Sequence, residues 1–195
     1  MLNRKGLSQL SFFMLPLLLV LCFSLGSKPA WALSIPQWIE FTPGTDQIPQ
    51  TKVLESNLQQ IILDIQIPGM WSEQTTTKGG DFYQLSIPEC GITNIIGEPN
   101  LPVLRKMVQI PYGAKVSVEI ISSDFVERSL AELGISERIM PVQPPIPKIE
   151  GAWENAPFVI HEEAYQSNDY YPIEAAGVME TGEIRGHRFA TIEIS

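Results

Sequence analysis

The chain has 195 residues, of which 16 are proline and 14 are glycine, with two histidines and two cysteines. Its formal net charge of −9 argues against a nucleic-acid-binding protein, because such proteins neutralise phosphates with a basic patch. So few histidines and cysteines leave little from which to build a metal site. A hydrophobic content of 44% is typical of a folded domain and too high for a disordered chain.

Residues 1–32 have the order of a secretory signal peptide. Two basic residues precede an apolar run over residues 12–23, and Ala30 and Ala32 stand at the positions that a signal peptidase reads. The apolar run is too short to span a bilayer, which takes about 20 residues. We therefore predict cleavage after Ala32 and export to the periplasm, the cell surface or the extracellular space, with no membrane association after cleavage.

Cleavage would change the chemistry available to the rest of the chain. It removes three basic residues and no acidic one, so the formal charge goes from −9 to −12. It also removes Cys22 and leaves Cys90 as the only thiol, so no intramolecular disulfide can form. The mature chain must therefore be held together by its own core, which is feasible at this length.

The sequence after the signal begins with a proline-containing stretch. Residues 33–52 contain three prolines and no sustained apolar period, and we expect an extended leader or linker there. Apolar residues at every second position then predict a strand over residues 59–67, although a helical stripe from Leu54 to Ile65 is an alternative. Residues 75–80 are rich in threonine and glycine and predict a turn-rich loop.

The middle of the chain predicts further strands. Residues 81–87 read as a short strand and residues 103–110 as the next, ending in a type I turn at Pro111 and Gly113. Valine and isoleucine then alternate with polar residues over 116–120, which is the clearest pattern of a half-buried strand in the sequence.

The last third predicts a surface segment and a hairpin. Residues 141–147 contain four prolines and are expected to run extended over the surface. Residues 173–179 and 184–194 then predict two strands joined by a turn at Thr181-Gly182. Apolar residues still alternate when the chain reaches Ser195, so we expect the sequence to end within an element.

Short strands punctuated by proline and glycine, without a long amphipathic helix, predict an all-β fold of antiparallel, sandwich-like type. The predicted organisation is a signal peptide at 1–32, a leader or linker at 33–52 and a β-domain at 53–195 that is cut at its C-terminus.

The sequence offers few candidates for catalysis or metal binding. Cys90 and either His161 or His187 could form a nucleophile and base, but nothing in their spacing brings them together, and a structural thiol is the preferred interpretation. A helical zinc motif needs a second histidine four residues from His161, and none is present. Calcium would have to rest on scattered acids without a loop signature, namely Glu162, Glu163, Asp169 and Glu174. We expect no catalytic residue, metal or cofactor.

Three motifs in order resemble those of a known family. They are Gly97-Glu98-Pro99-Asn100-Leu101-Pro102, Ile110-Pro111-Tyr112-Gly113-Ala114 with the predicted strand of Val116, Val118 and Ile120 after it, and Arg185-Gly186-His187-Arg188. Over residues 50–195 the chain resembles the N-terminal propeptide of the gingipain-type cysteine peptidases. The motif residues are turn formers or sheet residues with a structural role, and they are Gly97, Pro99, Leu101, Pro102, Pro111, Gly113, Arg185, Gly186 and Arg188.

The resemblance implies a function. In this family the propeptide is an all-β module that assists the folding of a caspase-like catalytic domain and covers its active site until proteolysis releases the zymogen. The implied partner is therefore the catalytic domain of a cysteine-type endopeptidase, in cis or in trans, which is absent from this chain. Such a propeptide acts as a protease inhibitor by presenting a basic residue to the specificity pocket, and the candidates here are Arg128, Arg138 and Lys148.

Two other interpretations remain open from the sequence. A secreted β-sandwich used for adhesion or cell-surface binding would share the fold without the peptidase partner. An incomplete cysteine peptidase would differ only in the residues after Ser195. In each case this chain carries no visible catalytic site, and its acidic charge is compatible either with a basic enzyme surface or with simple solubility.

Overall fold

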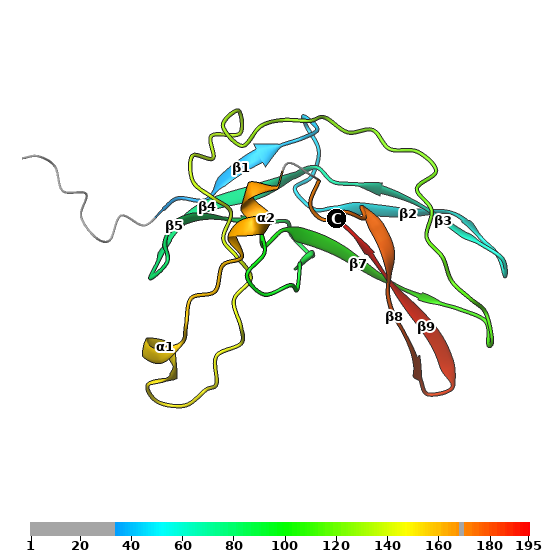
Figure 1. The fold of residues 1–195 in the computed structure, drawn as a ribbon. Coiled ribbons are helices and arrows are strands. Elements are labelled where there is room, and N and C mark those ends of the chain that lie inside the picture. Colours follow the sequence, from blue (N-terminus) through cyan, green and yellow to red (C-terminus); the bar gives the residue numbers. More distant parts are fainter. Residues whose placement is uncertain (1–33, 168–169) are drawn as a thin grey trace, which may run out of the picture. The chain divides into compact units, whose positions relative to one another are not determined.

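The fold is built almost entirely from antiparallel strands (Figure 1). The computed structural model describes residues 34–167 and 170–195, which belong to one compact unit. The predicted signal peptide and its cleavage residues Ala30 and Ala32 lie outside the described residues. No helix in the described ranges is long and apolar enough to cross a membrane.

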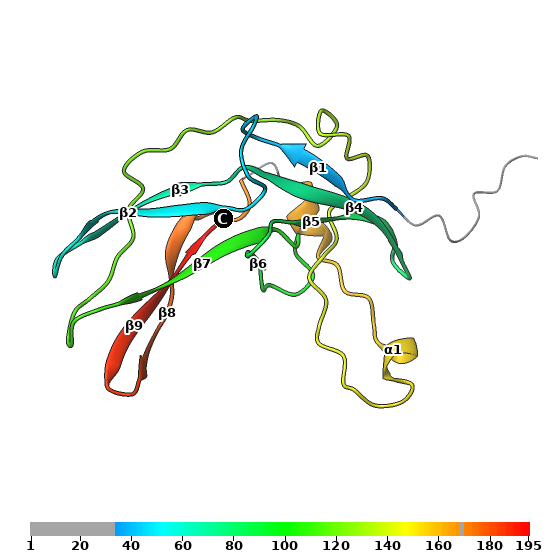
Figure 2. The same ribbon diagram turned by 180° about the vertical axis from the view of Figure 1, so that it is seen from behind.

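Nine strands and two short helices make up the described fold. They are β1 (Gln37–Glu40), β2 (Gln50–Ser56), β3 (Ile61–Gln66), β4 (Gly69–Thr77), β5 (Gly80–Ser86), β6 (Gly91–Ile92), β7 (Pro102–Gln109), α1 (Ala152–Asn155), α2 (Glu162–Gln166), β8 (Ala176–Ile184) and β9 (His187–Ile194). Three sheets result, with strand orders β1-β4-β5, β2-β3 and β6-β7-β9-β8 (Figure 2). Every pair of strands is antiparallel, and the predicted all-β class is confirmed.

The strands predicted at 59–67, 81–87 and 103–110 correspond to β3, β5 and β7. The stretch 33–52 differs from its expected extended leader, since it contains β1 and the start of β2. Ile39 in β1 is buried, and the four residues of this strand pair with β4. A strand of this length forms only because a longer neighbour supplies its hydrogen-bond partners, and that information is not local in sequence.

The expected loop at 75–80 is mostly strand. β4 runs to Thr77 and β5 begins at Gly80, so only Lys78 and Gly79 turn the chain. Threonine is a good strand former, and the cross-strand partner β5 converts the threonine run into the end of a hairpin.

The strand predicted at 116–120 is wrong. Residues 114–129 form neither helix nor strand, although Val116 and Val118 are half-buried and Ser117 between them is exposed. The predicted alternation of burial is therefore present at Val116 and Val118 but ends before Ile120, which is 52% exposed, and no strand of the described residues pairs with the segment. The turn that precedes it places Gly113 at a φ of 73°, which belongs to a type II rather than a type I turn.

The C-terminal hairpin is present, but its turn is displaced from the predicted Thr181-Gly182. The turn is at Arg185 and Gly186, whose φ angles are 52° and 78°. Two successive positive φ angles are typical of a type I′ turn, which matches the twist of hairpin strands. Gly182 instead lies within β8 opposite Phe189, an arrangement in which the aromatic ring can cover the glycine backbone.

The core lies between the β1-β4-β5 sheet and the segment around residues 135–142. Ile135 and Ile139 pack with apolar residues of the sheet, namely Ile39, Met70 and Leu85. Pro141 and Val142 are also buried, so the predicted surface course of 141–147 is wrong at its first two residues. Proline has no N–H to satisfy, and Val142 donates its N–H to the carbonyl of Glu98, so the buried backbone is paired.

Candidate functional site

The chain that follows β7 forms neither helix nor strand over residues 114–128. We call residues 114–128 the exposed segment; it runs as a coil without a strand partner (Figure 1). Its apolar side chains are unusually accessible to solvent, with 73% of Ile121, 79% of Phe125 and 76% of Val126 exposed. Extended surface patches of this kind are typical of sites that contact another protein.

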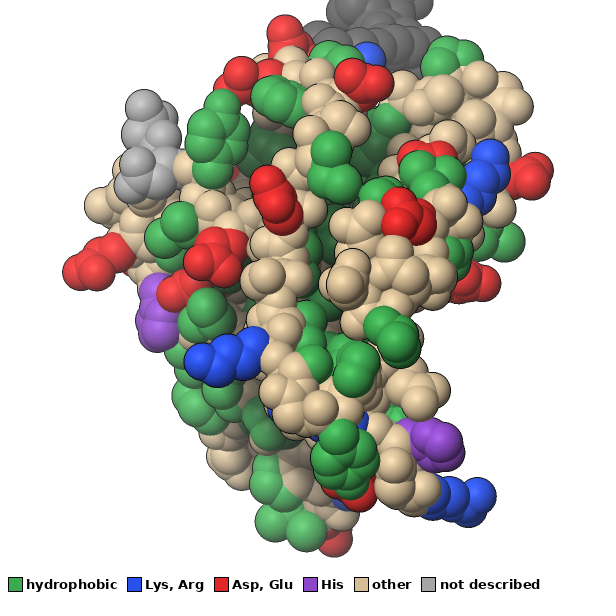
Figure 3. Space-filling view, turned by 90° about the vertical axis from the view of Figure 1, so that its right-hand side faces the viewer, with side chains coloured by type: hydrophobic (Ala, Val, Ile, Leu, Met, Phe, Trp, Pro, Cys, Tyr) green, Lys and Arg blue, Asp and Glu red, His purple; other side chains and the backbone are tan. Residues whose placement is uncertain are grey.

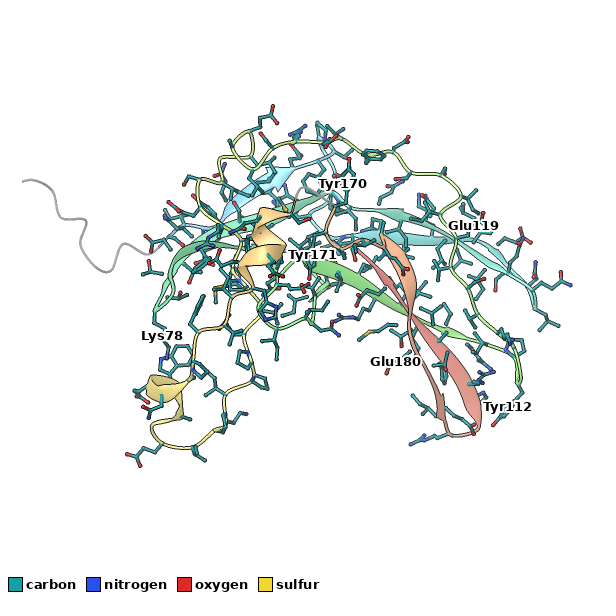
Figure 4. The ribbon with its side chains drawn as sticks, viewed as in Figure 1. Lys78, Tyr112, Glu119, Tyr170, Tyr171 and Glu180 are labelled. Atoms are coloured by element: carbon teal, nitrogen blue, oxygen red, sulfur yellow. The ribbon has the colours of Figure 1, made fainter. Side chains whose placement is uncertain are left out.

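The exposed segment is anchored at its start by the β8–β9 hairpin. The side chain of Arg188 donates a hydrogen bond of 2.9 Å from Nη1 to the carbonyl of Ala114, and its own carbonyl accepts from Ile110 at 2.9 Å. Tyr112 lies beside the hairpin turn (Figure 4) and donates to the Glu183 carboxylate, which raises the pKa of Tyr112. These contacts fix the point at which the chain leaves the sheet.

The end of the exposed segment meets a compact hydrogen-bonded turn, which we call the capped turn (residues 129–135). At its start, the backbone N–H of Ser129 donates to the Glu132 carboxylate at 2.8 Å, and Ser129 Oγ accepts from the N–H of Glu132 at 3.3 Å. This reciprocal pair is a capping box, whose sequence signature Ser-x-x-Glu is present at 129–132. The same hydrogen bonds hold the pKa of Glu132 below its ordinary value.

The capped turn closes with a Schellman-type pattern. Gly134 has a φ of 75° and donates to Ala131, while Ile135 donates to Leu130 at 2.9 Å. Ile135 is only 3% exposed and belongs to the core. Arg128 is therefore attached to a turn whose far end cannot move without withdrawing an isoleucine from the core.

Arg128 itself is exposed and lies between Val126 and the capped turn. Neither of the two ion pairs found in the described residues involves Arg128 or Lys148. Arg128 makes a small contribution to the lowered pKa of Glu132. The guanidinium is thus free to meet a partner.

Arg138 has a different environment, because its charge is used within the fold. Its Nη1 lies 2.7 Å from Glu162 Oε2, and its guanidinium carbon lies 5.9 Å and 5.5 Å from the ring centroids of Phe82 and Tyr165. Burial raises the pKa of Tyr165 to about 12. These contacts tie α2 to β5, so Arg138 is the weakest of the three candidates for meeting a partner.

Lys148 lies on a long arm, residues 143–161, that contains α1. Lys78 at the β4–β5 turn holds this arm (Figure 4): its Nζ donates to the carbonyls of Trp153, Glu154 and Ala156 at 3.2, 3.4 and 2.5 Å. Lys148 is exposed, as Arg128 is, but no capped turn of the described chain adjoins it.

The family-motif residues are placed at turns and sheet contacts, as their residue types suggest. Gly97 has a φ of 85°, and an added Cβ would lie 2.8 Å from the His161 ring. Pro99 forms a bridge with Pro141, and Pro102 begins β7. Leu101 adjoins Pro102, and Pro111 and Gly113 precede the exposed segment. Arg185 and Gly186 form the β8–β9 turn, and Arg188 contacts Ala114.

The thiol and the histidines form no hydrogen-bonded pair in the described structure. Burial is the main cause that raises the pKa of the Cys90 thiol, and the charged groups acting on it are Lys106 and Glu89. His187 Nδ1 lies 3.3 Å from Gln109 Nε2. Within the described ranges no cluster of three metal-ligating side chains is found.

Surface hollows of the described unit include the following two. One, of about 310 Å³, lies between the β2–β3 hairpin and β7 and is lined mainly by apolar and hydroxyl side chains. The other, of about 620 Å³, is lined by Glu98, His161, Glu162, Glu163 and Ala164. Figure 3 shows a face of the molecule on which hydrophobic side chains lie exposed among acidic ones. The strongest candidate site is the exposed segment together with the capped turn. There the free guanidinium of Arg128 lies next in sequence to the exposed apolar side chains of Phe125 and Val126.

Sequence reasoning named Arg128 but missed the capped turn beside it. The signals were present: Ser129 and Glu132 stand at capping-box spacing, and Gly134 follows at the position that favours a positive φ. A single turn is too short to give an apolar period, so pattern analysis of longer windows passes over it.

Comparisons with known proteins agree with this architecture. A family model described as Propeptide_C25 matches residues 43–195. Lys-gingipain of Porphyromonas gingivalis (strain ATCC 33277) is 36% identical over 119 residues, which are 61% of this chain and only 7% of that protein's length. The chain therefore spans a small part of this curated relative.

Two solved structures share the fold. One, described as "Structural insight into zymogenic latency of gingipain K from Porphyromonas gingivalis", has a TM-score of 0.66 at 28% identity and covers 84% of this chain and 86% of that chain. The other, a complex of Porphyromonas gingivalis RgpB pro- and mature domains, has a TM-score of 0.60 at 18% identity, and the match covers 74% of this chain and 72% of that chain. With a family match over most of its length, the chain belongs to the propeptide family of the gingipain-type cysteine peptidases.

Proposed function

We propose that this chain is exported and acts as a propeptide-type domain that inhibits a gingipain-like cysteine endopeptidase and assists the folding of its catalytic domain. Family membership supports the partner class, and a related structure is described as a complex of pro- and mature domains. The observation that carries the inhibitory part is Arg128, a free cation beside exposed apolar side chains at the end of an unpaired segment.

Arg128 is the preferred inhibitory residue among the three candidates. Arg138 is held by Glu162 and by two aromatic rings, and its removal from them would cost both interactions. Lys148 is exposed but lies on the arm that Lys78 holds against the β4–β5 turn. Arg128 instead follows Phe125 and Val126, which supply apolar surface for a cleft to bury.

The chemistry of such a contact is straightforward. A specificity pocket that selects basic side chains carries an acidic group, and a guanidinium fits a carboxylate with two parallel hydrogen bonds. Neighbouring exposed apolar residues would exclude water around that pair and strengthen it. The partner is therefore a peptidase that cleaves after arginine or lysine.

The test is inhibition of a purified gingipain-type peptidase by the purified chain. We expect a stable complex and competitive inhibition, with Arg128→Ala raising the inhibition constant by about 30-fold or more, the effect of losing a hot-spot side chain. Lys148→Ala is the matched control, because it removes an exposed cation from another surface segment, and it should change the constant less than twofold.

Absence of both inhibition and complex would refute the proposal. Capture of a surface protein or a glycan by the same chain would then support the alternative of an adhesion module. If Arg128→Ala and Lys148→Ala weakened inhibition equally, the chain would still be an inhibitor, but Arg128 would not be its key residue.

The folding role has its own experiment. A denatured catalytic domain is refolded with and without the chain, and the recovered peptidase activity is measured after the chain has been removed by proteolysis. We expect a higher yield with the chain present. An unchanged yield in a preparation where the chain inhibits the native enzyme would leave inhibition as its sole role.

A further inference from the structure

The peptide bond after Arg128 joins an exposed basic residue to the first residue of the capped turn. A peptidase of basic specificity hydrolyses such a bond by adding one water molecule, which leaves a carboxylate on Arg128 and an amino group on Ser129. An accessible arginine on an unpaired segment is ordinarily a substrate for this reaction. The structure around Ser129 bears on whether binding leads to cleavage.

The backbone on the C-terminal side of this bond is already committed to hydrogen bonds. The N–H of Ser129 donates to Glu132 at 2.8 Å, and the carbonyl of Ser129 accepts from Leu133 at 3.3 Å. The carbonyl of Leu130 accepts from both Leu133 and Ile135, at 3.1 and 2.9 Å. A cleft that binds its peptide as an extended strand needs these same groups for its own hydrogen bonds.

Extension of the capped turn would also disturb the core. Ile135, at the end of the turn that Ser129 begins, is 3% exposed and packs with Ile39 and Met70. Straightening the turn therefore breaks the capping box and the Schellman bonds together and strains a buried contact. The chain before Arg128 carries no such constraint, because the exposed segment has no strand partner.

We propose that the capped turn makes Arg128 an inhibitor rather than a substrate: Ser129 and Glu132 hold the bond after Arg128 in a form that peptidases of basic specificity cleave slowly. The exposed segment is free to enter a cleft up to Arg128, and the capped turn resists entry beyond it. Ser129 and Glu132 are thus positioning residues, and their biological role rests on the function proposed above.

Trypsin provides a direct test on the purified chain, without the gingipain-type partner. The rate of cleavage after Arg128 is followed by mass spectrometry and divided by the rate after Lys148, an exposed bond distant from the capped turn in sequence. We expect Glu132→Ala to raise this ratio about fivefold, the effect of losing one capping residue on a local opening equilibrium.

Two further variants separate the capping box from charge. Glu132→Gln keeps a side-chain oxygen that can accept the hydrogen bond from the Ser129 N–H. Trypsin should therefore cleave this variant after Arg128 as slowly as it cleaves the wild type. Glu127→Ala removes an acid on the other side of Arg128 and should leave the ratio within twofold of wild type. Equal acceleration in Glu127→Ala and Glu132→Ala, or no acceleration in Glu132→Ala, would overturn the proposal.

The gingipain-type peptidase gives the second measurement. Wild-type chain should inhibit it over hours and remain intact, whereas Glu132→Ala should inhibit at first and then be cleaved after Arg128 with recovery of activity. In a chain that also carries Arg128→Ala, the Glu132 substitution should have no effect on inhibition. A wild-type chain that does not inhibit refutes the proposed function alone, since the trypsin ratio still decides whether the capped turn protects the bond.

Discussion

At the scale of single residues, three basic side chains that sequence analysis could not rank have clearly different surroundings. Arg138 contacts a carboxylate and two rings, Lys148 lies on a tethered arm, and Arg128 is exposed beside the capped turn. The ion pair of Arg138 is half-exposed and contributes little by itself, because solvent screens it. Its contacts with Phe82 and Tyr165 add to that stabilisation.

The different surroundings predict opposite effects for two substitutions. Arg138→Ala should lower the free energy of unfolding by about 0.5–1 kcal/mol and leave inhibition unchanged. Arg128→Ala should leave the free energy of unfolding unchanged and weaken inhibition. Urea unfolding and inhibition constants measured on both variants check this, and a loss of inhibition in Arg138→Ala without a loss of stability would contradict it.

Glu132 predicts a pH dependence that is confined to the capped turn. Its hydrogen bonds from Ser129 lower its folded pKa below the ordinary 4.5. A carboxyl whose pKa is lowered by folding stabilises the folded form above its unfolded pKa, and this stabilisation is lost as the pH falls through the folded pKa. The amide of Ser129 should therefore be protected at neutral pH and lose protection below about pH 4.5. Glu132→Gln should abolish that dependence in amide exchange.

At the scale of elements, the hairpins form from local pattern while their connections depend on specific contacts between them. Lys78 is the clearest case, since one ammonium group satisfies three carbonyls at the end of α1. Phe158 adds to this contact, because its ring lies so close to Gly79 that an added Cβ there would collide with it. The arm is thus held to the β4–β5 turn by a cation and by close ring packing.

Lys78→Ala should release the arm and leave the sheet intact. We expect faster amide exchange over residues 152–158, because three carbonyls lose their charged donor. Exchange in β4 and β5 should not change. Lys115→Ala, which removes a lysine from another part of the chain, serves as the control, and equal exchange in the two variants would show that the ammonium does not hold the arm.

At the scale of the whole molecule, an acidic domain without a disulfide in its described residues must depend on its core for stability. That core lies partly between the β1-β4-β5 sheet and residues 135–142, which come directly after the capped turn. The residues that stabilise the fold therefore also fix one end of the proposed inhibitory site. This arrangement couples presentation of Arg128 to the folded state of the domain.

Export gives a prediction for the chain as a whole. When it is expressed in a Gram-negative host with its signal, the recovered protein should begin at Leu33, as determined by N-terminal sequencing. Ala32→Lys should block cleavage of the signal peptide, because the host's signal peptidase requires a small residue at that position. A mature N-terminus elsewhere would move the predicted boundary.

Much of the strand content could be predicted because it is local. Alternating apolar residues indicate β3, the apolar residues that end at a proline-glycine turn indicate β7, and the Ile184–Ile194 pattern indicates the last hairpin. The same reasoning failed at 116–120, where apolar and polar residues alternate in the sequence but no strand in the described part of the chain pairs with them. Hydrogen bonding between strands is a property of two segments, and a pattern in one of them cannot supply it.

By itself the sequence determined the all-β class through its period and the propeptide family through its ordered motifs. The resemblance to that family then implied the three basic candidates. Only the tertiary structure distinguished the candidates. Three features made the difference: the burial of Ile135, the ion pair of Arg138 and the lack of strand pairing at residues 114–128. Each depends on how segments far apart in the chain are placed by folding. A side chain's freedom to meet a partner depends on which neighbours already hold it, and those neighbours are brought together only by folding.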